Sequence, residues 1–221
     1  MHDARHSVWV RRLAAMAVSA GLLAGCGQPG DTSSDAGPAG APPTGEVIES
    51  TELSAVDSAT LADVRGAADA LGQGLMQALL AQLNANGPEA ALAFCADSAQ
   101  MLTADYQREG LDVHRTSLKV RNPRNAPDSV EVRVLDLLAA RHAEGTLTPE
   151  YVELRRLATG ARELRYFRPI RVAAGCLTCH GPSDAIAPSI KAVLAERYPE
   201  DAAVGYAEGD LRGVIAVRRG M

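Results

Sequence analysis

The chain has 221 residues, 47% of them hydrophobic and only 4% aromatic, and its formal net charge is −5. This length holds one ordinary domain once the ends are trimmed, and the apolar fraction is sufficient for a buried core. The acidic balance excludes nucleic acid as an expected partner, because binding phosphates requires a basic surface.

The first residues have the features of an export signal. A basic start, with arginines at positions 5, 11 and 12, precedes the apolar run Leu13–Ala24, which is too short to span a bilayer permanently. The run ends in Leu-Ala-Gly-Cys26, which resembles the bacterial lipobox, where a lipoprotein signal peptidase cuts before a cysteine that carries acyl chains. We therefore expect a signal peptide at residues 1–25 and lipidation of Cys26; an ordinary signal peptide with an incidental cysteine is the alternative.

Cleavage at this point changes the expected membrane interaction. It removes three basic residues and one acidic residue, so the net charge changes from −5 to −7. The mature chain is then not suited to electrostatic docking on anionic lipid, and attachment would depend on the acyl chains. We expect a bacterial cell-envelope protein facing the periplasm, and Gly27 in place of Asp favours the outer membrane.

The mature chain divides into a tether and one domain. Residues 26–52 are rich in Gly, Pro, Ser, Ala and Thr and cannot bury enough surface to fold. We expect them to be a flexible tether that holds a domain of residues 53–221 away from a membrane.

The domain begins with two expected helices. The first is capped by Asp57 or Ser58 and has leucines at helical spacing as far as Leu83. Asn86-Gly87-Pro88 then interrupts the pattern, since Gly suits the end of one helix and Pro the first turn of the next. The second helix is expected over residues 88–108, and its apolar stripe places Cys95 on the buried face.

Strands dominate the remainder of the chain. The expected elements are, in order, an extended segment Leu111–Val120, a turn-rich loop Arg121–Ser129, a helix Val130–Ala143, strands Tyr151–Leu157 and Glu163–Val172, a helix Ser189–Arg197, and a strand, turn and strand over Ala203–Arg218. Thr159-Gly160 would form the hairpin turn between the first two strands. Helices followed by local hairpins predict an α+β fold with an antiparallel sheet.

The pattern Cys176-Leu-Thr-Cys179-His180 indicates covalent haem attachment. Two thiols separated by two residues suit addition across the two vinyl groups of haem, and the next histidine can bind the iron. A thioredoxin-like dithiol would need a βαβ context with the motif opening a helix, and zinc would need further ligands such as a second CxxC. We therefore expect one haem c, with Cys176 and Cys179 as the attachment residues and His180 as an axial ligand.

The second axial ligand is less defined by the sequence. If Cys26 carries lipid and two cysteines hold haem, Cys95 is left as an odd thiol in an oxidising compartment. It could be an iron ligand or a small core residue. The other possible ligands are Met76, expected in the core, Met101, expected on a helix flank, His114, expected in a strand, and His142, expected near a helix C-terminus.

Three stretches carry a resemblance to known proteins: ALAFCADSA around Cys95, RTSLKVRNPRNAPDSVE at Arg115–Glu131, and RYFRPIRVAAGCLTCHGP continuing to YPEDAAVGYAEGDLRGVIAV. They resemble the family of bacterial PAS-like c-type monohaem domains. Together they cover nearly all of residues 53–217. One departure is Val130, where a larger, often aromatic residue is expected.

The resemblance implies a PAS-like antiparallel sheet flanked by N-terminal helices and His/Cys ligation of the haem iron, with Cys95 as the cysteine. Arg121, Tyr166 and Arg168, which lie near the family motifs, are the expected haem-pocket residues. A thiolate ligand stabilises ferric iron, so a low reduction potential is expected.

Three functions fit these observations. The first is redox or ligand sensing by a tethered haem protein, the second is simple electron carriage in the periplasm, and the third is a haem enzyme such as a peroxidase. The enzyme ranks last, because no paired carboxylates or Ser/His/Asp group can be identified and a six-coordinate iron has no open position. The redox or signalling partner is not indicated by the sequence.

Overall fold

The computed structural model describes residues 45–48, 56–108 and 110–221, with only the backbone at 45–48. The predicted signal peptide, Cys26 and most of the predicted tether lie outside these residues. Strand β1 (Gly45–Ile48), however, falls inside the segment expected to be a tether, and it pairs antiparallel with β3. A short edge strand is held by main-chain hydrogen bonds, which leave little trace in composition.

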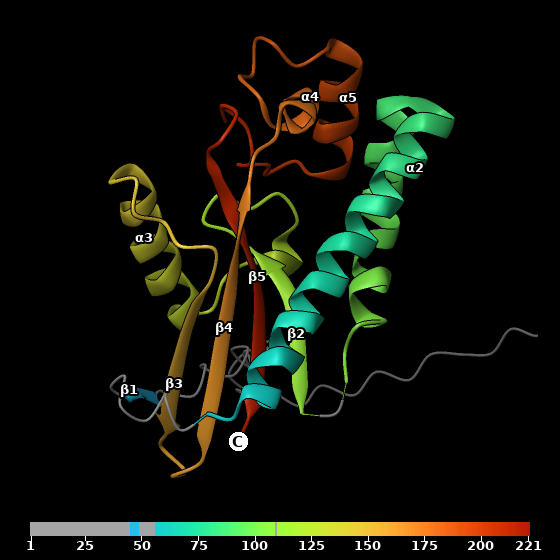
Figure 1. Ribbon diagram of the computed structural model, residues 1–221. Helices are drawn as coiled ribbons and strands as arrows, with labels where there is room; N and C mark the ends of the chain where they lie inside the picture. Colours follow the sequence, from blue (N-terminus) through green and yellow to red (C-terminus); the bar gives the residue numbers. More distant parts are fainter. Residues whose placement is uncertain (1–44, 49–55, 109) are drawn as a thin grey trace, which may run out of the picture. The chain divides into compact units, whose positions relative to one another are not determined.

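An antiparallel sheet forms the centre of the described residues (Figure 1), with strand order β1-β3-β4-β5-β2. The further strands are β2 (Leu111–Thr116), β3 (Tyr151–Leu157), β4 (Arg162–Arg171) and β5 (Leu211–Gly220). The predicted hairpin joins β3 to β4 and turns at Gly160, whose φ of 84° favours glycine. The α+β class with an antiparallel sheet is therefore confirmed.

One expected strand is absent from the structure. Residues 203–206 are not a strand, so the predicted strand-turn-strand at the end of the chain is wrong, and only β5 forms there. Gly205 and Tyr206 donate their amides to carbonyls of the CxxCH segment, Gly181 and His180, at 2.8 and 3.0 Å. These amides are thus used to hold the motif and not to pair with a strand.

The predicted pair of helices is present as two arms of α2 (Ser58–Ala104). Asp57 caps the first arm by accepting from the Thr60 amide, and the chain reverses at Gly87, which has φ 79° and ψ 176°, just before Pro88. Figure 1 shows the first arm rising along the sheet and the second returning beside it. The expected break is therefore confirmed, although the second arm ends at Ala104 and not Arg108.

The side chain of Tyr106, which follows α2, packs closely on the first arm at Gly74. A Cβ atom at this position would overlap the hydroxyl of Tyr106, from beyond the end of the second arm. Gly74→Ala should therefore destabilise the fold by about 1–3 kcal/mol, because overpacking displaces the ring of Tyr106. Gly66→Ala, on the same arm with open space around it, should instead stabilise by about 0.5–1 kcal/mol. Urea unfolding of both variants checks this, and equal effects would contradict the close approach.

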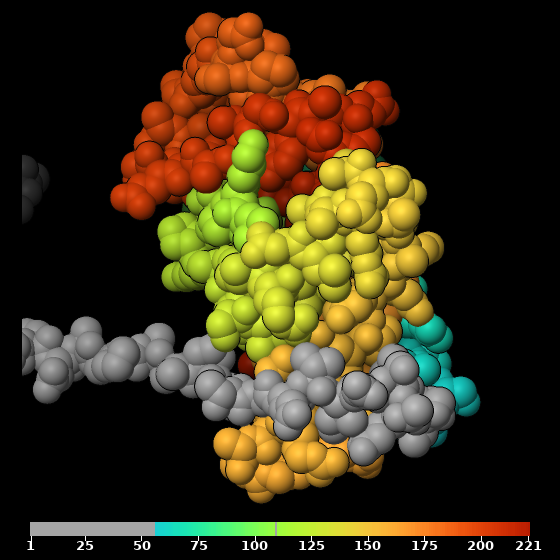
Figure 2. Space-filling view, turned by 90° about the vertical axis from the view of Figure 1, so that its left-hand side faces the viewer, coloured from blue at the N-terminus to red at the C-terminus, as the bar shows by residue number. Residues whose placement is uncertain are grey.

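Helices cover both faces of the sheet. The first arm of α2 packs against one face through a core that joins Val64, Ala68 and Leu71 to Leu164, Tyr166 and Ile215, among others. On the other face, α3 (Ser129–Ala143) packs Val134, Leu135 and Leu138 against Phe167 and Val214. Figure 2 shows this α3 face, with α3 in yellow below the orange and red segments that follow β4. The N-cap of α3 is Asp128, which forms a capping box with Glu131.

The segment after β4 lies beyond the end of the sheet (Figure 1). It holds the short helices η2 (Ala174–Cys176) and α4 (Leu177–His180), then α5 (Pro188–Arg197). Leu92 of the second arm of α2 packs on Ile186, Ile190 and Leu194, so α5 is fastened to that arm. As a result, the CxxCH motif is close to the part of α2 that carries Cys95.

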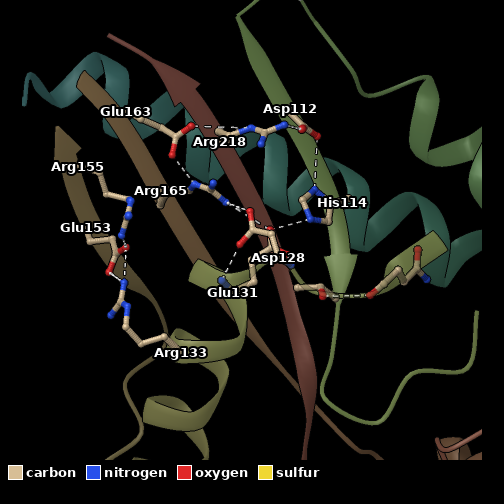
Figure 3. A network of polar contacts seen from close by, with 12 residues as sticks. Asp112, His114, Asp128, Glu131, Arg133, Glu153, Arg155, Glu163, Arg165 and Arg218 are labelled. Atoms are coloured by element: carbon tan, nitrogen blue, oxygen red, sulfur yellow. Dashed lines mark hydrogen bonds and ion pairs between the residues drawn. The ribbon is translucent and has the colours of Figure 1, made fainter. Parts of the chain in front are cut away.

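A network of charged side chains lies between the sheet and the N-terminus of α3 (Figure 3). At its centre is Arg165 of β4, which is 2% exposed and donates to Glu163 at 2.6 Å and to Asp128 at 2.9 Å. Its Nη1 also lies 3.5 Å from the buried carboxylate of Glu131. The network thus joins β4 to the cap of α3, and the sequence pattern did not predict it.

The network continues to β2 through His114. Its ring lies between the carboxylates of Asp112, at 3.4 Å, and Glu131, at 2.9 Å. Burial opposes protonation, but hydrogen bonding and attraction from these two carboxylates outweigh it and raise the pKa of His114 to about 9. His114 is therefore a cation at neutral pH that links β2 to α3.

Across the residues that the structure describes, helices of sufficient length lack the apolar stretch needed to cross a membrane.

Candidate functional site

A cavity lies where the reversal of α2 meets the end of the sheet. Its empty volume is about 1060 Å³, including the solvent at its mouth. Cys95 of α2 lines it together with Cys176, Cys179 and His180, which follow β4. The fold therefore brings together side chains that are about eighty residues apart, as the expected ligand set requires.

The CxxCH motif is folded into a single helical turn. Cys176 ends η2 and is the N-cap of α4, and Cys179 and His180 lie in that turn. The motif therefore does open a helix, and this weakens one of the two arguments against a thioredoxin-like dithiol. The other reason holds, because the motif connects the antiparallel neighbours β4 and β5 and is not in a βαβ unit. In the described residues, no three His, Cys, Asp or Glu side chains form a group that could hold a metal ion.

The ring of His180 is held in one orientation. Its Nδ1 lies 2.7 Å from the carbonyl oxygen of Ala203; a carbonyl only accepts, so Nδ1 carries the proton and Nε2 keeps its lone pair. Tyr206 packs edge-on against the ring, with centroids 6.2 Å apart. Burial and the cation of Arg121 lower the pKa of His180 to about 4. His180 is therefore a neutral imidazole with a free Nε2, the form that binds metals.

Arg121 braces the motif from the loop after β2. Its Nη2 donates to the carbonyls of Cys179, at 2.5 Å, and Ala203, at 3.2 Å, and it pairs with Asp201 at 3.0 Å. This side chain lines the cavity, and its three contacts hold the motif in place. Any contact of Arg121 with a bound ligand would be additional to these three contacts.

Cys95 lies in the part of the cavity wall that α2 contributes. It is half-buried and forms no disulfide, and the same holds for Cys176 and Cys179. Burial raises the pKa of the Cys95 thiol, while the cations of Arg115 and Arg121 act in the opposite direction. The thiol is thus held beside two positive charges in a mostly apolar wall.

The remaining predicted residues lie elsewhere. Tyr166 is fully buried in the core between α2 and the sheet, and Arg168 donates to its hydroxyl at 3.1 Å and pairs with Asp69. Neither residue lines the cavity. Both residues are on β4, which directly precedes the motif in the sequence, and this nearness suggested that they share its pocket. In the structure they lie instead on the face of the sheet that the first arm of α2 covers.

The alternative axial ligands also do not line this cavity. His114 is in β2, as expected, within the charged network, and His142 is in the last turn of α3, which covers the opposite face of the sheet. Met101 is 63% exposed on its helix, in agreement with its expected flank position, whereas Met76 is 47% exposed, so the core position expected for it is wrong.

Several residues of the cavity were not predicted. Arg115 of β2 and Arg212 of β5 line it, as do the amides of Asn122 and Asn125 and the ring of Tyr198. The Nε of Arg115 is buried and has no hydrogen-bond partner in the described residues. Arg115 is the first residue of a stretch that carries the family resemblance, and this position was the one sequence signal that pointed to it. No such sequence signal points to Arg212, because only the pairing of β5 with its neighbours brings this residue to the cavity.

The fold and the cavity define a class of protein. It is an α+β domain whose antiparallel sheet carries a CxxCH motif at one end, and this motif shares a cavity with a cysteine from a distant helix. Residues 46–219 match the model of the Tll0287-like family, and the chain belongs to that family. It is similar to the crystal structure of the cyanobacterial haem protein Tll0287, with a TM-score of 0.54 and 26% identity, over 75% of this chain and 98% of that chain. No curated protein matches the sequence.

Proposed function

We propose that this chain is an exported, lipid-anchored protein with one covalently bound haem, which acts in redox or ligand sensing. The observation that carries the proposal is the cavity that holds Cys95 together with Cys176, Cys179 and His180. Membership of the Tll0287-like family and the likeness to a cyanobacterial haem protein support haem as the ligand. Residues 13–26, with their lipobox-like ending, support export and lipid anchoring, and Gly27 in place of Asp supports the outer membrane.

The residues of the cavity fit a haem. Its walls are largely apolar, from Leu79, Leu83, Ala91, Leu92 and Ala99, and its charged side chains are arginines 115, 121 and 212. A haem is an apolar ring with two carboxylates, so it matches such a wall with cations at its border. The unpartnered Nε of Arg115 supports this fit, because a buried donor needs an acceptor. We propose Arg115 and Arg212 as partners of the propionates, in preference to Tyr166 and Arg168.

The residues of the motif would each have one role. The thiols of Cys176 and Cys179 would add across the two vinyl groups, each forming a C–S and a C–H bond with no leaving group. His180 would donate Nε2 to the iron while the Ala203 carbonyl fixes its ring, and Cys95 would be the second axial ligand. When bound, the haem would supply a one-electron couple of its iron. The PAS-like description belongs to this proposal and is supported by the antiparallel sheet with α2 on one face.

Electron carriage is the second candidate, and one observation favours it. Within the motif and just before it, Ala173, Ala174, Gly175 and Thr178 are exposed. A haem attached to this turn would have an edge near the surface, where electrons can be exchanged with a partner. Slow electron exchange by the purified protein would favour sensing over carriage.

Replacing Cys95 with serine tests the ligand assignment. We expect changed absorption and electron paramagnetic resonance spectra of the ferric protein, and a reduction potential higher by on the order of 100 mV or more, because a thiolate stabilises ferric iron. Met101→Ser is the matched control, since it removes an exposed sulfur from the same arm of α2 and should leave both properties unchanged. Identical spectra in both oxidation states for Cys95→Ser would show that Cys95 is not a ligand.

A further inference from the structure

The carbonyl oxygen of Ala203 accepts hydrogen bonds from two side chains. His180 donates to it from Nδ1 at 2.7 Å, and Arg121 donates to it from Nη2 at 3.2 Å. A carbonyl oxygen has two lone pairs and can accept both bonds. The histidine of the motif and a guanidinium cation are therefore joined through one main-chain oxygen, which lies in the loop between α5 and β5.

The position of Arg121 is fixed by Asp201, from the same loop. Oδ2 of this carboxylate lies 3.1 Å from Nε and 3.0 Å from Nη2 of Arg121. Oδ1 accepts a hydrogen bond from the amide of Ala203 at 2.8 Å. Asp201 thus holds both the cation and the residue that carries the shared carbonyl. The side chains of Arg121 and Asp201 are only 10% and 8% exposed, so salt and water screen their charges weakly.

The two charges differ in their relation to the cavity. Arg121 lines the cavity, whereas Asp201 does not. A cation in the wall of a haem site disfavours ferric iron, which carries one more positive charge than ferrous iron. A carboxylate paired with that cation offsets part of this effect. The charges of Arg121 and Asp201 should therefore shift the reduction potential of a bound haem in opposite directions.

The shared carbonyl adds an effect on the histidine itself. A hydrogen bond from Nδ1 to an acceptor makes the imidazole a stronger electron donor at Nε2. Donation from Arg121 to the same oxygen draws electron density away from it, and this weakens the bond from His180. A weaker bond makes His180 a poorer donor and favours ferrous iron, so this effect acts in the same direction as the charge of Arg121.

We propose that Arg121 and Asp201 are positioning residues that set the reduction potential of the haem iron through His180. The inference rests on the proposed haem function and specifies how the redox response of that site is tuned. Arg121 raises the potential, and Asp201 lowers it by offsetting Arg121. Since neither residue belongs to the expected ligand set, this tuning is additional to the effect of the Cys95 thiolate.

Potentiometric titration of the haem-loaded protein tests the proposal. Arg121→Gln should lower the midpoint potential relative to wild type, and Asp201→Asn should raise it. Lys119→Gln is the matched control, because Lys119 donates to the next carbonyl along the chain, that of Val204, at 3.1 Å from an exposed position; its potential should be unchanged. Shifts of both test variants in one direction, as general loosening of the site would produce, or no shift in either, would overturn the proposal.

The Nδ1 proton of His180 provides a second readout. In proton NMR spectra of the ferric protein, its signal should move in opposite directions in Arg121→Gln and Asp201→Asn and stay in place in Lys119→Gln. An unmoved signal together with shifted potentials would show that the charges act on the iron directly and not through His180, against the proposal.

Two kinds of failure can be told apart. Arg121→Gln also loses the bond to the carbonyl of Cys179, and if this variant does not acquire haem, the sign of the shift in Asp201→Asn decides the question. A lower or unchanged potential in Asp201→Asn then overturns the inference. Failure of the wild-type chain to acquire haem would instead overturn the proposed function.

Discussion

Replacing both Cys176 and Cys179 with alanine will yield a protein that retains no covalent haem. Produced in a bacterium with the machinery for haem attachment, the wild-type chain should keep its haem stain on a denaturing gel, and the double variant should lose it. The physical reason is that a thioether survives unfolding, whereas axial bonds and packing in the cavity do not. Each single variant should retain one thioether and a shifted absorption band.

The matched control is Cys95→Ala. Cys95 shares the cavity with the motif but has no proposed role in attachment, so this variant should keep its covalent haem while its spectra change. If the double variant still carries haem through denaturation, the two thiols are not the attachment sites. If Cys95→Ala loses the stain as well, Cys95 contributes to attachment or to folding of the site.

Arg165→Leu should be the most destabilising single substitution outside the cavity. Arg165 is 2% exposed and has three carboxylates as neighbours, those of Glu163, Asp128 and Glu131. Its removal leaves buried negative charge without its main partner, which typically costs about 3–5 kcal/mol. We expect a loss of this size in the free energy of unfolding, measured by denaturant titration at pH 7, and a partial recovery in Arg165→Lys.

Arg197→Leu is the comparison for this result. Arg197 pairs with Asp97 at 3.1 Å, but both side chains are exposed, and such pairs contribute about 0–1 kcal/mol. Similar losses in Arg165→Leu and Arg197→Leu would mean that burial of the network does not determine its contribution. Because His114 also contacts Glu131, the effect of Arg165→Leu should not add to that of His114→Leu.

Local chemistry explains why several elements could be predicted. The cap at Asp57, the reversal at Gly87-Pro88, the capping box of Asp128 and the turn at Gly160 each depend on contacts within a few residues. The expected strand at residues 203–206 failed for the opposite reason. Its composition suits a strand, but its polar main-chain groups bond to the motif more than twenty residues earlier.

The sequence by itself determined the CxxCH motif, the odd thiol at Cys95 and the α+β class, because spacing, cysteine number and hydrophobic period are properties of the chain. Only the tertiary structure decided which other side chains lie beside the motif and Cys95. Strand register brings Arg115 and Arg212 to the cavity and keeps Tyr166 in the core, and a distant carbonyl at Ala203 orients His180. These contacts join residues far apart in sequence, and they exist only once the strands have paired and α2 has folded back at Gly87.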